Sequence, residues 1–107
     1  MPSVRFLPGA QDDYFDALEW FINHNPVQGD RFEAAVERSL DDIEDVPKRW
    51  PLKDAQTRMR PVTGFPYVIF YRETSELVVV VAIAHTSRDP EYWHGRELES
   101  GNEDDPG

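Results

Sequence analysis

The chain contains no cysteine among its 107 residues. This absence excludes disulfide bonds, thiolate nucleophiles and cysteine-based zinc sites, and it is consistent with a reducing compartment. The longest apolar run, residues 77–84, is far shorter than the roughly 20 residues of a membrane-spanning helix, and no N-terminal segment resembles a signal peptide. His24 and His94 show no metal-ligand spacing, and no glycine-rich phosphate loop is present. We therefore expect a soluble, cytoplasmic protein without a metal or other cofactor.

Positive charge is also scarce, because the net charge is −10. Residues 1–47 carry 3 basic against 11 acidic residues, residues 48–96 carry 8 against 5, and residues 97–107 carry 5 acidic residues and no basic one. An acidic protein is poorly suited to indiscriminate binding of nucleic acids or anionic membranes. Length and composition fit one domain over residues 1–96, followed by an acidic tail over residues 97–107 that we expect to be disordered.

The N-terminal half predicts a strand followed by two helices. Weak alternation over residues 4–7 predicts a short strand, closed by Pro8 and Gly9. Apolar residues at helical spacing predict helices over residues 10–25 and 27–46, and Pro26 separates them. Two amphipathic helices joined by a tight link form an antiparallel pair.

The C-terminal half predicts three strands, over residues 58–62, 67–72 and 77–85. The last of these contains a continuous run of Val, Ala and Ile, which is typical of a buried central strand. The fold class that follows is α+β. It has a short N-terminal strand and an antiparallel helix hairpin packed on a small antiparallel sheet, in the order β-α-α-β-β-β.

The order of these elements resembles the RelE/ParE superfamily of type II toxin-antitoxin toxins. The segments that carry the resemblance are GFPYVIFY at residues 64–71, VVAIAH at residues 80–85 and RDP at residues 88–90. The resemblance covers residues 3–96. It implies a growth-inhibiting toxin, of the kind found in plasmid stabilisation systems, that a cognate antitoxin neutralises. RelE-like members cleave ribosome-bound mRNA without a metal, whereas ParE-like members poison DNA gyrase.

A nuclease site would lie at the polar end of the last strand. Metal-free RNA cleavage needs a base for the 2′-hydroxyl, an acid for the leaving oxygen and cations around the phosphate. His85 is the candidate acid or base, and Tyr92 is a proton donor or a stacking ring. Arg60 and Arg88 are the candidate phosphate clamps. A strand-end histidine is also a common structural residue, and Arg88 begins a stretch that has the composition of a simple turn.

Two departures from the nuclease pattern favour the ParE-like branch. Lys53 stands without the clustered lysines of RelE, and Thr86 occupies the position where related nucleases have tyrosine after the strand-end histidine. We therefore expect a gyrase-directed toxin. The alternatives are an mRNA interferase and a family member that binds an antitoxin without being toxic.

Basic and aromatic residues of the C-terminal half are candidates for binding the target or an anion. They are Lys53, Arg58, Arg60, Arg88, Trp93 and Arg96. The alternative interpretation is a solvated strand face for the arginines, and packing of the C-terminal segment onto the sheet for Tyr92 and Trp93.

The helices supply candidates for binding a partner. Trp20 lies off the apolar stripe of the first helix. The second helix carries an acidic ridge, within which Glu37 and Asp41 are the candidates to meet a basic segment; a solvated face is the alternative. The ridge consists of Asp30, Glu33, Glu37, Asp41 and Glu44. Antitoxins of the family wrap a helix and an extended segment around the toxin, so the resemblance also implies an apolar surface or an open strand edge on the isolated chain.

Overall fold

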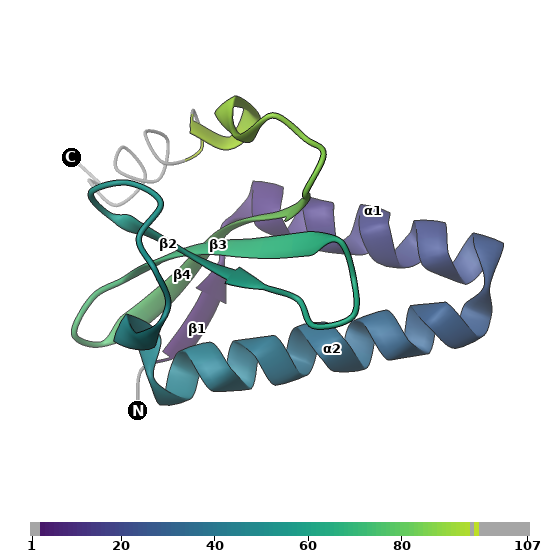
Figure 1. Ribbon diagram of the computed structural model, residues 1–107, viewed down its shortest axis with the longest axis horizontal. Helices are drawn as coiled ribbons and strands as arrows, with labels where there is room; N and C mark the ends of the chain where they lie inside the picture. The colour runs from purple at the N-terminus through teal and green to yellow at the C-terminus, as the bar shows by residue number, and fades with distance from the viewer. Residues whose placement is uncertain (1–2, 95, 97–107) are drawn as a thin grey trace.

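The computed structural model describes residues 3–94 and residue 96, and it has a helix hairpin packed on one face of a four-stranded sheet (Figure 1). The regular elements are β1 (Ser3–Phe6), α1 (Pro8–His24), α2 (Pro26–Asp45), β2 (Thr57–Pro61), β3 (Tyr67–Glu73) and β4 (Leu77–His85). Two short 3₁₀ turns complete the chain, η1 (Pro47–Arg49) and η2 (Pro90–Trp93). The predicted α+β fold and its order of elements are confirmed, while the predicted tail over residues 97–107 lies outside the described residues.

The sheet has the strand order β1-β4-β3-β2, so β4 is central, as its apolar run predicts. β2, β3 and β4 form an antiparallel meander. β1 differs from the expected antiparallel arrangement because it pairs parallel with β4, from Ser3 opposite Leu77 to Phe6 opposite Val80. The sheet is therefore mixed. A parallel neighbour needs a long crossover, which the helix hairpin provides, and a strand of four residues carries no sign of its direction in its own sequence.

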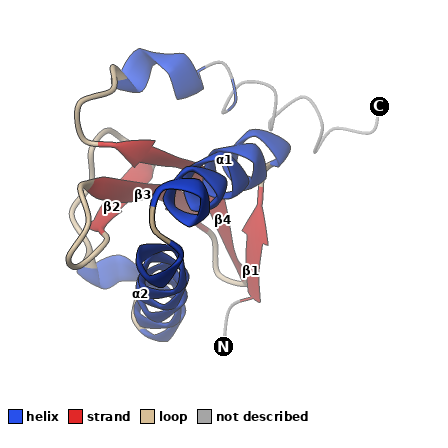
Figure 2. Cartoon of the chain, turned by 90° about the vertical axis from the view of Figure 1, so that its right-hand side faces the viewer, coloured by secondary structure: helices blue, strands red, loops and turns tan. Residues whose placement is uncertain are grey.

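Local chemistry sets the ends of both helices. α1 begins at Pro8, two positions before the expected start, because proline is well tolerated in the first turn of a helix. Asn25 separates the helices: its backbone N–H donates to Phe21 at 2.6 Å, and its side-chain oxygen accepts from the N–H of Val27 at 3.2 Å. Figure 2 looks nearly along both helices and shows them side by side against the sheet.

The sheet buries apolar residues on both faces. We call the side under the helices the covered face and the other side the open face. The covered face holds the larger cluster, which includes Phe32, Ile43, Val80 and Ile83. The open face holds a smaller one, and its members are Val68, Phe70, Val81, Ala82, Ala84 and Trp93. No helix in the described part of the chain is long and apolar enough to cross a membrane.

Candidate functional site

A bulge in β4 decides where the strand-end histidine points. Phe70 pairs with Ala82 and the next residue, Tyr71, pairs with Val80, so Val81 is an extra residue in β4. A bulge of this kind shifts the alternation of side chains by one position. Beyond it, His85 leaves the sheet on the side of α1 and lies edge-on to the ring of Tyr67, with 5.2 Å between ring centroids.

The hydrogen bonds of His85 define its chemistry. Nδ1 accepts from the backbone N–H of Ser87 at 3.0 Å and lies 2.8 Å from the Ser87 hydroxyl. A ring nitrogen that accepts an N–H carries no proton, so the neutral ring has its proton on Nε2. In this tautomer, Nε2 of His85 is a hydrogen-bond donor.

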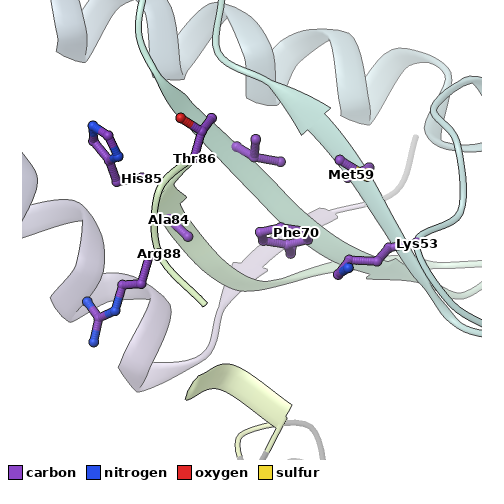
Figure 3. Close-up of a pocket in the computed structure, with 8 residues that line it drawn as sticks. Lys53, Met59, Phe70, Ala84, His85, Thr86 and Arg88 are labelled. Carbon is purple, nitrogen blue, oxygen red and sulfur yellow. The ribbon is translucent and has the colours of Figure 1, made fainter. Parts of the chain in front are cut away.

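A hollow of about 260 Å³ lies on the open face, next to the end of β4. Its floor is apolar and includes Met59, Phe70 and Ala84. Figure 3 shows this floor between Lys53 on one side and His85 and Arg88 on the other. An apolar surface with cations at its rim suits a ligand that combines an apolar group with negative charge.

A second hollow, of about 230 Å³, lies between α1 and the ends of β3 and β4. Trp20 and Asp16 line it from α1, and Tyr67 lines it from β3. His85 and Arg88 line both hollows and therefore form the ridge between them. We call this ridge and the two hollows the strand-end surface.

Arg60 has a different environment from Arg88. It is 7% exposed and lies on the covered face, where Nη2 donates to the Asp42 carboxylate of α2 at 2.7 Å. Its guanidinium carbon stands 4.5 Å from the ring centroid of Trp50. Arg60 lines neither hollow of the strand-end surface.

Arg58 is also engaged within the protein. Its Nε donates to Glu73 at 2.6 Å, and Nη1 donates to the carbonyl of Trp50 at 2.7 Å. The two arginines share one strand face, as their spacing predicts. That face is not a solvated one: Arg60 is buried beside α2, and Arg58 is partly buried against Glu73 and the segment around Trp50.

The C-terminal segment packs back onto the sheet. Trp93 is fully buried and lies 4.8 Å from Phe70 between ring centroids. Tyr92 donates to the Asp13 carboxylate of α1 at 3.2 Å, and Arg96 donates to the same carboxylate at 2.6 Å and 3.2 Å. Burial, followed by the nearby charge of Asp13, raises the pKa of Tyr92 to about 12. The packing interpretation of the C-terminal aromatics therefore describes Trp93 correctly.

The predicted site residues separate into two groups. Lys53, His85 and Arg88 meet at the strand-end surface. The other members of the target-binding set, which are Arg58, Arg60, Trp93 and Arg96, make the internal contacts given above. The sequence did not point to Asp13 beyond its place near a helix start, because its partners Tyr92 and Arg96 are 79 and 83 positions away.

The partner candidates on the helices are exposed. Trp20 is 54% exposed and stacks on His24 with 4.0 Å between ring centroids. Glu37 and Asp41 are exposed on α2. Whether any of the three binds a partner stays a prediction.

The two edges of the sheet differ. The outer edge of β2 is covered by the preceding segment, because the N–H of Met59 donates to Pro51 and the N–H of Lys53 donates to Thr57. β1 forms the other edge, and in the described part of the chain no strand pairs with its outer side. Among residues 3–94 and 96, no group of three or more His, Asp or Glu side chains is arranged to hold a metal ion.

The sequence profile of a family described as the ParE toxin of type II toxin-antitoxin system, parDE, matches residues 4–90. The chain belongs to the ParE toxin family. A solved structure described as the chromosomal ParDE TA system from P. aeruginosa has a similar fold, with a TM-score of 0.69 and 12% sequence identity. The match covers 79% of this ParE-family chain and 96% of the other. No curated protein matches the sequence.

Proposed function

We propose that this ParE-family chain is the toxin of a type II toxin-antitoxin system, acts in the cytoplasm, and inhibits growth by poisoning DNA gyrase until a cognate antitoxin neutralises it. Family membership supports the toxin role. The choice of gyrase rests on one observation, the separation of the residues that RNA cleavage would require.

Arg60 and Arg88 would both have to reach one phosphate in a nuclease. Arg60 is instead buried against Asp42 and Trp50 on the covered face, whereas Arg88 is exposed at the end of β4. Nδ1 of His85 is occupied by the backbone N–H of Ser87, and the hydroxyl of Tyr92 donates to Asp13, which together with burial raises the pKa of Tyr92 to about 12. Both candidate proton-transfer groups are therefore engaged within the protein. This arrangement favours a binding surface over a metal-free nuclease.

Within the strand-end surface, the first hollow and the ridge of His85 and Arg88 are the region that we assign to the protein target. Arg88 and Lys53 supply exposed positive charge, and the floor between them supplies apolar area. Charges at a rim steer encounter, and apolar floors supply affinity. The open outer edge of β1, the exposed ring of Trp20 and the acidic residues Glu37 and Asp41 are assigned to the antitoxin.

The test is a pair of assays on the purified chain: inhibition of supercoiling by bacterial DNA gyrase, and cleavage of mRNA on programmed ribosomes. Inhibited gyrase with intact mRNA is the expected result. Arg88→Ala and Lys53→Ala should weaken the inhibition, and Arg31→Ala, which removes an exposed charge from α2, is the matched control.

Two other outcomes contradict the proposal. Cleaved mRNA that is lost in His85→Ala and Arg88→Ala would assign the chain to the interferases. Abundant, folded protein that binds the antitoxin and leaves growth and gyrase unaffected would assign it to the non-toxic members. Growth measured with and without an adjacent antitoxin reading frame distinguishes a toxic chain from a non-toxic one in cells.

A further inference from the structure

One carboxylate, that of Asp13 in α1, accepts hydrogen bonds from two distant parts of the chain, β4 and the C-terminal segment. Oδ2 accepts from the backbone N–H of Ile83 at 3.1 Å, from the hydroxyl of Tyr92 at 3.2 Å and from Nη1 of Arg96 at 2.6 Å. Oδ1 accepts from Nη2 of Arg96 at 3.2 Å. The Asp13 side chain is 9% exposed. These four donors match the acceptor capacity of an ionised carboxylate.

The neighbouring backbone is shaped for this contact. A Cβ added to Gly9 would clash with Nε of Arg96, so the Arg96 side chain lies directly over the first turn of α1. Any larger residue at this position has to displace Arg96. Gly9 therefore leaves the space that Arg96 occupies, and Asp13 holds Arg96 there by an ion pair.

Tyr92 connects this cluster to the strand-end surface. Its hydroxyl is held by Asp13, and its ring lies under the guanidinium of Arg88, whose carbon stands 3.9 Å from the ring centroid. Arg96 also stands over this ring, at 5.0 Å. The charge of Arg96 is matched by Asp13. No carboxylate in the described part of the chain stands within ion-pair distance of Arg88, so its donors remain available to another molecule.

We propose that Asp13 is a positioning residue for target binding: through the ring of Tyr92 it holds Arg88 at the strand-end surface, where the guanidinium binds an acidic group of the toxin's protein target. This inference rests on the proposed function. An arginine on a flexible stem loses conformational freedom when it binds, and stacking on a fixed ring reduces that loss.

The hydroxyl and the ring of Tyr92 have separate parts in this arrangement. Tyr92→Phe removes the contact with Asp13 but keeps the surface on which Arg88 stacks. Tyr92→Leu removes both. Inhibition should therefore weaken in the order wild type, Tyr92→Phe, Tyr92→Leu, with the last close to Arg88→Ala.

The decisive experiment is a double-mutant cycle on the full chain, with gyrase inhibition and growth arrest as readouts. Arg88→Ala should weaken inhibition about tenfold, Asp13→Asn should weaken it about as much as Tyr92→Phe, and the double variant should be within about twofold of Arg88→Ala alone. Glu19→Gln, the same charge change at an exposed position of α1, is the control. Additive losses would overturn the proposal, because Asp13 would then act independently of Arg88.

The salt dependence of inhibition distinguishes a positioning role for Asp13 from a purely structural one. The Arg88 contact with an acidic target weakens as salt rises, so Arg88→Ala should flatten the salt dependence of inhibition. Asp13→Asn should flatten it in the same direction but less, with folding verified by thermal unfolding. If Asp13→Asn fails to fold, Tyr92→Phe takes its place in the cycle, and an unchanged salt dependence in that variant overturns the proposal.

The cycle also distinguishes this inference from the proposed function. A chain that arrests growth without inhibiting gyrase refutes the gyrase target. Non-additive growth arrest in that case upholds the positioning of Arg88 for another protein target, and additive growth arrest rejects it. A wild-type chain that neither arrests growth nor inhibits gyrase refutes both the proposed function and this inference.

Discussion

The arginines of the covered face and the arginine at the end of the open face have opposite environments. On the covered face, Arg58 and Arg60 lie close to carboxylates, at 2.6 Å from Glu73 and 2.7 Å from Asp42. At the end of the open face, Arg88 is exposed and rests on the ring of Tyr92. The difference teaches that an arginine count says little about a binding surface until each guanidinium is assigned to a face.

The cost of burial explains the contrast. A guanidinium under helices loses its water and has to be matched by a carboxylate or carbonyl oxygens. The positive charges of the covered face are therefore already matched inside the protein. The strand-end surface keeps its charge in solvent, where an external acidic group can reach it. Substitutions on the covered face should reduce stability, and substitutions on the strand-end surface should reduce binding.

The largest expected effect comes from the centre of the covered face. Phe32 is fully buried among the rings of Phe21, Phe65 and Tyr67, with centroids 4.9, 5.3 and 5.1 Å away. Phe32→Ala should lower the free energy of unfolding by about 3–5 kcal/mol, because it removes apolar contacts and leaves a cavity. Urea unfolding measures this value.

Phe15 is the matched control for this experiment, since it is an aromatic residue of the same hairpin and 54% exposed. Phe15→Ala should cost less than about 1 kcal/mol. Equal losses in the two variants would mean that the helices do not bury the sheet as described.

The next effect compares the two arginines directly. Arg60→Ala should cost about 1–3 kcal/mol, because it removes the ion pair with Asp42 and the packing on Trp50. Asp42 is 46% exposed, so it is rehydrated when its partner is lost, which limits the cost. Arg88→Ala should change stability by no more than about 0.5 kcal/mol.

The effects of the same two variants should be reversed when inhibition of the target is measured in place of stability, at a temperature where both variants are folded. Arg88→Ala should be impaired and Arg60→Ala should retain most of the inhibition. Loss of inhibition in a fully folded Arg60→Ala protein would contradict the assignment of roles to the two faces.

The sequence was sufficient for the elements but not for the faces. Apolar periodicity predicts both helices and β4, since it reflects burial directly. The extra residue Val81 produces no pattern of its own, yet it decides that His85 lies beside α1. Spacing shows that Arg58 and Arg60 lie on the same face of their strand. Only the position of α2 decides that this is the covered face. Long-range partners, such as Asp13 and Arg96, leave no local signal at all.

The tyrosines allow both sides of the sheet to be tested by pH. Burial raises the pKa of all four, to about 12 for Tyr14 and Tyr92, above the usual range for Tyr67, and most strongly for Tyr71, whose hydroxyl donates to the carbonyl of Pro47. The folded state therefore holds these protons more tightly than the unfolded chain. The resulting stability is complete below pH 10, the ordinary tyrosine value, and is lost as pH rises from 10 through the folded-state pKa values.

Phenolate absorbance should follow unfolding on titration of the native protein to alkaline pH. Little absorbance should develop around pH 10, and most should appear together with the loss of helix signal. Tyr92→Phe should leave the signal of the covered-face tyrosines unchanged. Early titration of one or more tyrosines in a folded chain would show that those rings are more open to water than the packing described here.

The smallest expected effect concerns the outer surface of α2, which belongs to neither face. Glu33, Glu37 and Asp41 follow one another at spacings of four along an exposed helix surface. Like charges at this spacing repel, so Glu37→Gln should stabilise the fold by a few tenths of a kcal/mol at low salt, and the gain should shrink as salt screens the repulsion. If the ridge meets a basic segment of the antitoxin, reversing the charge at Glu37 and Asp41 should weaken that complex and reduce its salt dependence while leaving gyrase inhibition intact. An antitoxin affinity that does not respond to either reversal would leave the ridge as a solvated surface, with the repulsion as the cost of solubility.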